Sequence, residues 1–462
     1  MTCARRAIWH KSKSVLCEAA LAVVVMVTLP GPMAAAAGAD PPAAFIGAAA
    51  CAGCHTSQFD ARKGSHHARA MQPVTTATVL GDFADASLED FGVTTTFFRN
   101  GGRFMVRTDG PDGTLHDYPV AYTFGVYPLQ HYLIAFPGGR LQALGIAWDS
   151  RPKDQGGQRW FQLYPGQQLK PGDPLHWTGR DQTWNYQCAG CHSTDLKNYD
   201  LAANACATSW TDLDVACEGC HGPGSLHIAW AKAHAKDGAY PSGTDATRMG
   251  LTNWLKSTDS SHCEMNPETG ISRRTEKLVS TELETCAACH SRRKVIAHNT
   301  RPGAPYLEGY LPALLESGLY HADGQIDGEV YEYGSFLQSR MHAAGVTCSN
   351  CHDPHSAKLR AEGNALCAQC HLPEKFDVAS HYHHRPGNAG AQSVNCHMPT
   401  KNYMIVDARR DHSIRVLRYD LSVALGHPNA CNQCHADRSA QWAAETVGGW
   451  YPGGPSSTGT VG

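Results

Sequence analysis

The sequence predicts an α+β protein, with a small antiparallel β insertion and a mostly helical and loop region that has little regular sheet. Residues 90–165 contain β-branched and aromatic runs broken by glycine-rich turns, which is typical of β-hairpins. Residues 166–440 instead carry closely spaced cysteine–histidine motifs, which leave little sequence for an ordinary apolar core. A chain of 462 residues is also long enough for two or three domains.

The first 37 residues are predicted to be a secretory signal peptide. Basic side chains precede a short apolar run at 21–29, and small residues follow at 34–37. The apolar run is far shorter than the roughly 20 residues that a membrane span needs, so we expect cleavage near Ala37 and no stable transmembrane anchor. A retained N-terminal anchor is the alternative. The mature protein is expected to be periplasmic or otherwise exported.

Charge argues against a nucleic-acid partner. Removal of residues 1–37 takes away four basic side chains and one acidic one, so the formal net charge of −3 becomes −6. Nucleic-acid binding needs clustered Lys and Arg. An acidic exported protein is instead compatible with basic redox partner proteins, whose identity the sequence does not give.

The β insertion is predicted to contain about five strands. Asn-Gly-Gly at 100–102 and Asp-Gly-Pro-Asp-Gly at 109–113 mark its turns. Nothing catalytic stands out in this segment. We therefore favour a scaffold role over partner docking or substrate gating.

Fourteen of the 19 cysteines fall in seven copies of the pattern Cys-x-x-Cys-His. The copies are Cys51-Cys54-His55, Cys188-Cys191-His192, Cys217-Cys220-His221, Cys286-Cys289-His290, Cys348-Cys351-His352, Cys367-Cys370-His371 and Cys431-Cys434-His435.

This pattern indicates covalently bound haem. Two thiols three positions apart on a tight turn can both reach the vinyl groups along one porphyrin edge, and the next residue can then bind the iron. Structural zinc sites and disulfide frameworks are the alternatives, but neither requires a histidine directly after every second cysteine. Cys206 and Cys263 fit no motif and could form a disulfide or remain free thiols.

The motifs divide the chain into segments. We expect the haems themselves to form most of the core in the haem-rich part. The predicted segments are a signal peptide at 1–37, a first haem segment at 38–89, the β insertion at 90–165, a multihaem region at 166–440, and a short helix with a disordered tail at 441–462.

One further motif is altered. Residues 393–397 read Ser-Val-Asn-Cys-His, so Ser393 stands where the first cysteine is expected. The segment could hold an eighth haem through a single thioether at Cys396, with His397 as ligand and His412 as a possible second ligand. It could equally have lost its haem, and the sequence leaves both readings open.

Histidine is in surplus. Eight of the 26 histidines directly follow a motif cysteine, and 18 remain, including three at 381, 383 and 384. This surplus favours two histidine ligands for most haems, an arrangement that transfers electrons but leaves no open position for bond-making chemistry. The alternative is a haem-dependent reductase or oxidase of a nitrogen or sulfur compound at one five-coordinate iron. No catalytic residue is predicted.

Several linked motifs resemble those of multihaem cytochromes c of the cytochrome c-554 type, which have doubled CxxCH domains. They include "SHHARAM", "CEGCHGPGSLH", "GSFLQSRMHAAGVTCSNCHDPHS", "CHMPTKNYM" and "HPNACNQCHADRSAQWA", and the resemblance covers nearly the whole mature chain. It implies an extracytoplasmic electron-transfer protein with closely packed, mostly bis-histidine haems. By matching position it implies the second axial ligands His67, His227, His342, His355, His384 and His412, with His131 and His298 as further candidates.

The chain departs from this family in two places. Many relatives carry a tetratricopeptide-type helical domain after the last motif, whereas this sequence stops within about 30 residues, which puts a docking role of such repeats in doubt. The family also has a cysteine at the position of Ser393. The sequence therefore predicts one-electron transfer through seven haems c with two thioethers each, and leaves the eighth open.

Overall fold

The structure is a computed structural model that describes residues 42–197, 207–236, 245–255, 263–276, 280–298 and 300–454. The predicted signal peptide, Cys206 and residues 455–462 of the predicted tail lie outside the described residues.

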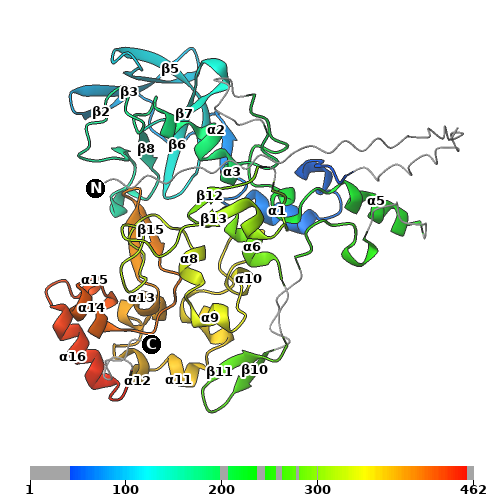
Figure 1. Cartoon of the computed structure of the whole chain (residues 1–462). Coiled ribbons are helices and arrows are strands. Elements are labelled where there is room, and N and C mark those ends of the chain that lie inside the picture. The colour runs from blue at the N-terminus through cyan, green and yellow to red at the C-terminus, as the bar shows by residue number, and fades with distance from the viewer. Residues whose placement is uncertain are drawn as a thin grey trace, which may run out of the picture. The chain divides into compact units, whose positions relative to one another are not determined.

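A nine-stranded antiparallel sheet forms the N-terminal part of the described chain (Figure 1). Its main path runs in the order β2-β3-β4-β5-β6-β8-β9, while β1 pairs with β5 and β7 pairs with β6. The strands are β1 (Met71–Pro73), β2 (Ala86–Asp90), β3 (Val93–Asn100), β4 (Arg103–Asp109), β5 (Leu115–Phe124), β6 (Leu129–Ala135), β7 (Leu141–Ala143), β8 (Ile146–Asp149) and β9 (Arg159–Gln162).

Two-residue turns join the first strands of this sheet. Gly101 and Gly102 connect β3 to β4 with φ values of 55° and 83°, and Phe91 and Gly92 connect β2 to β3 with 46° and 83°. Positive φ at both central positions matches the right-handed twist of a hairpin and is easily adopted by glycine. The Asn-Gly-Gly turn of the sequence is therefore in place.

The prediction of a small β insertion is wrong. The sheet has nine strands instead of about five, and it begins at β1 and β2, before residue 90. It curls until its two edges approach each other: Phe97 of β3, the neighbour of the end strand β2, stacks on Trp160 of the end strand β9 with ring centroids 3.5 Å apart. Phe83 lies edge-on to both rings. These aromatic side chains give the sheet a close-packed hydrophobic core of its own, in addition to any core in the motif region.

The motif region is built from short helices. In Figure 1, α9 and α10 lie to one side of the C-terminal helices α14, α15 and α16, and α8 lies nearer the sheet. The helices are α1 (Thr56–Lys63), α2 (Trp184–Gln187), α3 (Ala189–His192), α4 (Cys217–His221), α5 (Ser225–His234), α6 (Glu282–Ala287), α7 (Tyr306–Gly309), α8 (Tyr333–Phe336), α9 (Arg340–Ala343), α10 (Cys348–Cys351), α11 (Pro373–Phe376), α12 (Ala379–Tyr382), α13 (Ser393–His397), α14 (Tyr419–Leu425), α15 (Ala430–Cys434) and α16 (Ala440–Trp450).

Three two-stranded hairpins interrupt these helices. They are β10 (Cys263–Asn266) with β11 (Ile271–Arg274), β12 (Arg293–Val295) with β13 (Tyr310–Pro312), and β14 (Thr400–Tyr403) with β15 (Asp407–Arg410). Within the described ranges, no helix combines the length and apolar character that crossing a bilayer would require.

Candidate haem sites

Each predicted motif lies on one tight turn. In five motifs the backbone N–H of the histidine donates to the carbonyl of the first cysteine, four positions earlier: His55 to Cys51 (3.0 Å), His290 to Cys286 (2.8 Å), His352 to Cys348 (2.9 Å), His371 to Cys367 (2.9 Å) and His435 to Cys431 (2.8 Å). In an α-turn, residues i, i+3 and i+4 lie on one face. The two thiols and the imidazole of a motif can therefore face the same group.

Five motif histidines lie opposite a second imidazole from another part of the chain. The ring-centroid separations are 5.8 Å for His55–His227, 6.2 Å for His290–His67, 6.5 Å for His221–His355, 6.0 Å for His397–His381 and 6.3 Å for His435–His384. Two imidazoles bound to one metal through bonds of about 2 Å have ring centroids roughly 6 Å apart. The separations thus fit one iron between each pair.

The hydrogen bonds of five predicted ligand histidines leave one ring nitrogen of each for a metal. In each case below Nδ1 lies against a backbone carbonyl, which can only accept, so Nδ1 carries the proton and Nε2 keeps its lone pair. The bonds are His192 to Ala70 (3.1 Å), His227 to Met249 (2.7 Å), His384 to Tyr382 (2.6 Å), His397 to Arg415 (2.6 Å) and His412 to Arg410 (3.0 Å).

Two histidines outside the predicted set, His176 and His116, use Nε2 for contacts within the protein. His176 in the sheet region contacts Asp109 through Nε2 and Thr178 through Nδ1, and the Nε2 of His116 lies 3.0 Å from Asp112. This contrast supports a ligand role for the histidines whose Nδ1 is bonded to a backbone carbonyl, because an imidazole that binds a metal through one nitrogen is commonly held in place by a hydrogen bond of the other nitrogen.

Burial keeps several of these imidazoles neutral, which is the form that binds a metal. Burial and the neighbouring imidazole of His290 lower the pKa of His67 to about 4, and burial with His355 lowers the pKa of His221 to about 4. Burial and His192 likewise lower the pKa of His131 to about 3. Burial, followed by the proximity of His412, lowers the pKa of His352.

His290 differs from the other motif histidines because its Nδ1 contacts a carboxylate. Oε2 of Glu332 lies 3.0 Å from it. Burial disfavours the imidazolium form of His290, but the hydrogen bond and charge of Glu332 outweigh burial and raise its pKa. A carboxylate on the second nitrogen makes an axial histidine a stronger electron donor.

The predicted second ligands do not all meet a motif histidine in the same way. Four of them lie opposite the ring of a motif histidine: His67, His227, His355 and His384. His131 lies near His192, and His412 lies near His352. His342 in α9 packs against Phe336 with ring centroids 5.6 Å apart, and His298 is exposed after β12.

The predicted set of second ligands does not include His381. His381 lies opposite His397, the position for which the sequence suggested His412. The sequence singled it out only as one of three histidines at 381, 383 and 384. Of these three, only His381 lies within α12 (Ala379–Tyr382), and no local pattern in the sequence distinguishes it.

Neighbouring motifs contact each other through their cysteines. The thiol pairs Cys51–Cys217, Cys191–Cys289 and Cys286–Cys348 are in side-chain contact. The sulfur of Cys396 lies close enough to Cys431 and Cys434 for their charges to raise its pKa, in addition to burial. These contacts join the motifs into three groups: the first with the third, the second with the fourth and fifth, and the altered one with the last.

Two segments match known families. Residues 167–222 match the family described as cytochrome c554 and c-prime, and residues 342–376 match the doubled CXXCH motif. No curated protein sequence matches the chain.

Two solved structures are similar. The outer cell wall cytochrome OcwA shares 18% sequence identity, with a TM-score of 0.54 over 88% of this chain and 86% of that one, which indicates a common fold. The octaheme sulfite reductase MccA of Wolinella succinogenes shares 14% identity over 80% of this chain and 58% of that one, and its TM-score of 0.34 is too low for a structural argument. The two family segments contain four of the seven intact motifs, and with them identify the chain as a multihaem c-type cytochrome related to the cytochrome c554 type.

Proposed function

We propose that the chain is an exported electron-transfer protein that passes single electrons along closely spaced haems c, most of them held by two histidines. The observation that carries the proposal is the set of paired imidazoles about 6 Å apart, drawn from distant parts of the chain. Haem c bound there would supply a one-electron Fe(III)/Fe(II) couple.

The polypeptide has two tasks in this proposal. The two cysteines and the histidine of each motif would hold a haem, while the second histidine would supply a further ligand to its iron and exclude exogenous ligands. Backbone carbonyls on Nδ1 hold these rings in one orientation, so little rearrangement would accompany electron transfer.

Contacts between motif cysteines support transfer from site to site. A thioether sulfur is bonded directly to the porphyrin edge, so contact between Cys51 and Cys217, or between Cys286 and Cys348, would bring two haem edges together. The donor and acceptor are expected to be redox proteins outside the cytoplasm. The formal charge of −6 without residues 1–37 favours basic ones.

Electron paramagnetic resonance of the haem-loaded protein tests the proposal. We expect mainly low-spin signals, and replacement of His227 by Ala should convert one haem to high spin because Nε2 of His227 would no longer close the axial position. His116→Ala is the matched control, since His116 is exposed and bonded to Asp112. A high-spin haem in the unaltered protein that is oxidised by nitrite, hydroxylamine or tetrathionate would instead favour the reductase alternative.

A further inference from the structure

The segment with Ser393 retains the backbone of an intact motif. Helix α13 spans Ser393–His397 as α4 spans Cys217–His221. Each ends with the next backbone N–H bonded to the carbonyl of the second helical residue, Met398 to Val394 (2.9 Å) and Gly222 to Glu218 (3.0 Å). Cys396 and His397 therefore occupy the positions that Cys220 and His221 occupy in an intact motif.

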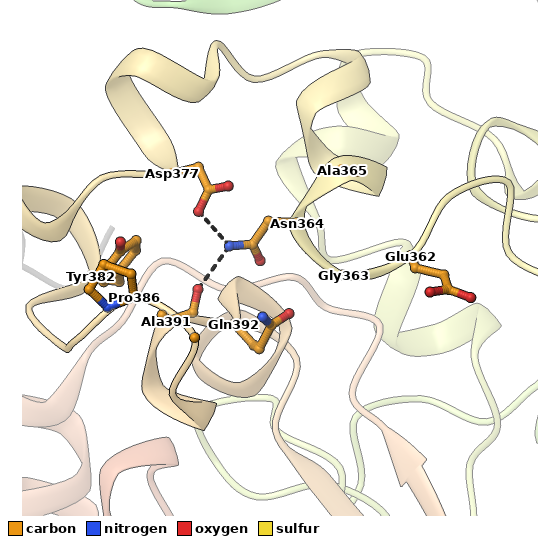
Figure 2. A pocket seen from close by; sticks show the side chains of 10 residues that line it. Glu362, Gly363, Asn364, Ala365, Asp377, Tyr382, Pro386, Ala391 and Gln392 are labelled. Carbon is orange, nitrogen blue, oxygen red and sulfur yellow. Dashed lines mark hydrogen bonds between the residues drawn. The ribbon is translucent and has the colours of Figure 1, made fainter.

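The start of α13 is fixed by Asn364. Figure 2 shows the amide nitrogen of Asn364 bonded to the carboxylate of Asp377 and to the carbonyl of Ala391. The amide oxygen of the same side chain accepts the backbone N–H of Ser393 at 2.9 Å. One side chain thus ties three segments together at the first residue of the altered motif.

Arg410 fixes the other end of α13. Its guanidinium donates to the carbonyls of Val394 (3.2 Å) and Met398 (3.1 Å) and to the side chain of Asn395 (3.1 Å). The turn is therefore held from both sides without a bound group.

His397 is oriented like the other predicted ligands, and it has a partner. Its Nδ1 donates to the carbonyl of Arg415 at 2.6 Å, which leaves Nε2 free. The ring of His381 lies opposite, at 6.0 Å between centroids and 12° between planes. This separation falls inside the 5.8–6.5 Å range of the four pairs at intact motifs.

The altered segment also connects other sites. Cys396 lies near Cys431 and Cys434 of the last motif, and His397 lies near His371 of the preceding one. An electron that moves from the site of His371 to the site of His435 would find this segment between them.

We infer that residues 393–397 hold an eighth haem, attached through one thioether at Cys396 and ligated by His397 and His381. The inference rests on the proposed function, because it assumes that the intact motifs bind haem. In attachment, the S–H bond of Cys396 would add across one vinyl group, so that sulfur bonds to one vinyl carbon and hydrogen to the other, without an oxidant or reductant. The hydroxyl of Ser393 cannot replace the second thiol, so the second vinyl group would remain.

The intact mass of the mature, acid-denatured protein, expressed with a complete haem-attachment system, tests the inference. We expect eight haem masses, one of them on the peptide containing residues 393–397, and seven in Cys396→Ala. The pyridine haemochrome band should include a red-shifted component, because the remaining vinyl group stays conjugated with the porphyrin. In Ser393→Cys the count should stay at eight and that component should disappear.

Other outcomes separate the two proposals. Seven haems with an unmodified Cys396 would overturn the eighth haem and leave the proposed function standing. A count of eight in the native protein that falls to seven on denaturation would overturn the covalent bond to Cys396, and would also leave the proposed function standing. No haem at all would overturn the proposed function itself. For the second ligand, His381→Ala should keep eight haems and convert one to high spin, whereas His383→Ala, whose ring stacks on Trp450, should not. An unchanged spin state in His381→Ala would remove His381 as a ligand.

Discussion

Replacement of Glu218 by Gln should loosen the segment that leads into the first motif. Glu218 lies inside the second of the clustered motifs and is only 2% exposed. Its carboxylate accepts the backbone N–H groups of Ile46 (3.0 Å), Gly47 (2.8 Å) and Gly224 (2.7 Å). One charged side chain thus joins residues 46–47 to the start of α5, which carries His227.

The size of the expected change in local stability follows from the hydrogen bonds that Glu218→Gln weakens. A bond to a charged acceptor contributes about 1.5–3 kcal/mol, and a neutral one about 0.5–1.5 kcal/mol. Gln retains one acceptor oxygen and places an N–H₂ group against at least one backbone donor. The free energy of local opening then falls by about 3 kcal/mol, which corresponds to a roughly 100-fold larger population of locally open molecules.

Hydrogen exchange followed by mass spectrometry measures this opening. Peptides covering residues 44–50 should exchange up to roughly 100-fold faster in Glu218→Gln, while peptides from the sheet stay unchanged. Glu89→Gln is the control, because Glu89 is exposed on β2. Equal exchange of residues 44–50 in the two variants would show that the carboxylate does not hold this segment, and would refute the reasoning.

Three further predictions follow from single contacts. Glu332→Gln removes a negative charge that would stabilise Fe(III) beside His290, so redox titration should show one haem with a raised reduction potential. The increase should be roughly 60 mV for each 1.4 kcal/mol of lost Fe(III) stabilisation, and an unchanged set of potentials would contradict this. Burial raises the pKa of Asp109, but the hydrogen bond and charge of His176 outweigh burial, so the pKa in the folded protein lies below its usual value. The ionised carboxylate therefore stabilises the fold above about pH 4, and this stabilisation is lost as pH falls through the pKa of the folded protein. Acid denaturation of Asp109→Asn should therefore show a weaker pH dependence below about pH 4 than that of the unaltered protein. Phe97→Ala should cost about 3–5 kcal/mol because Phe97 is 0% exposed in the aromatic core, and an unchanged melting temperature of the sheet would contradict that packing.

The motifs could be recognised from sequence because their chemistry is local. Two thiols and an imidazole within five residues specify a turn and a ligand set without reference to the rest of the fold. The second ligands could be predicted only as a set. His227 meets His55 across more than 170 residues, and no local pattern encodes such a pair.

The extent of the sheet could not be predicted for a related reason. The strand β2, Ala-Ser-Leu-Glu-Asp, has no strong strand pattern and is an edge strand that pairs only with β3 along the sheet path. It is a strand because its backbone completes the ladder beside β3, and tertiary context of this kind overrides local propensity.

The sequence by itself determined that this chain is a cytochrome with seven intact haem-attachment motifs and one altered one, because covalent attachment depends on residues adjacent in the chain. Only the tertiary structure decided which histidine faces which motif, that His381 rather than His412 lies opposite His397, and that the sheet closes on an aromatic core. These are long-range pairings, whose stability depends on how distant segments pack and not on the residues beside each partner.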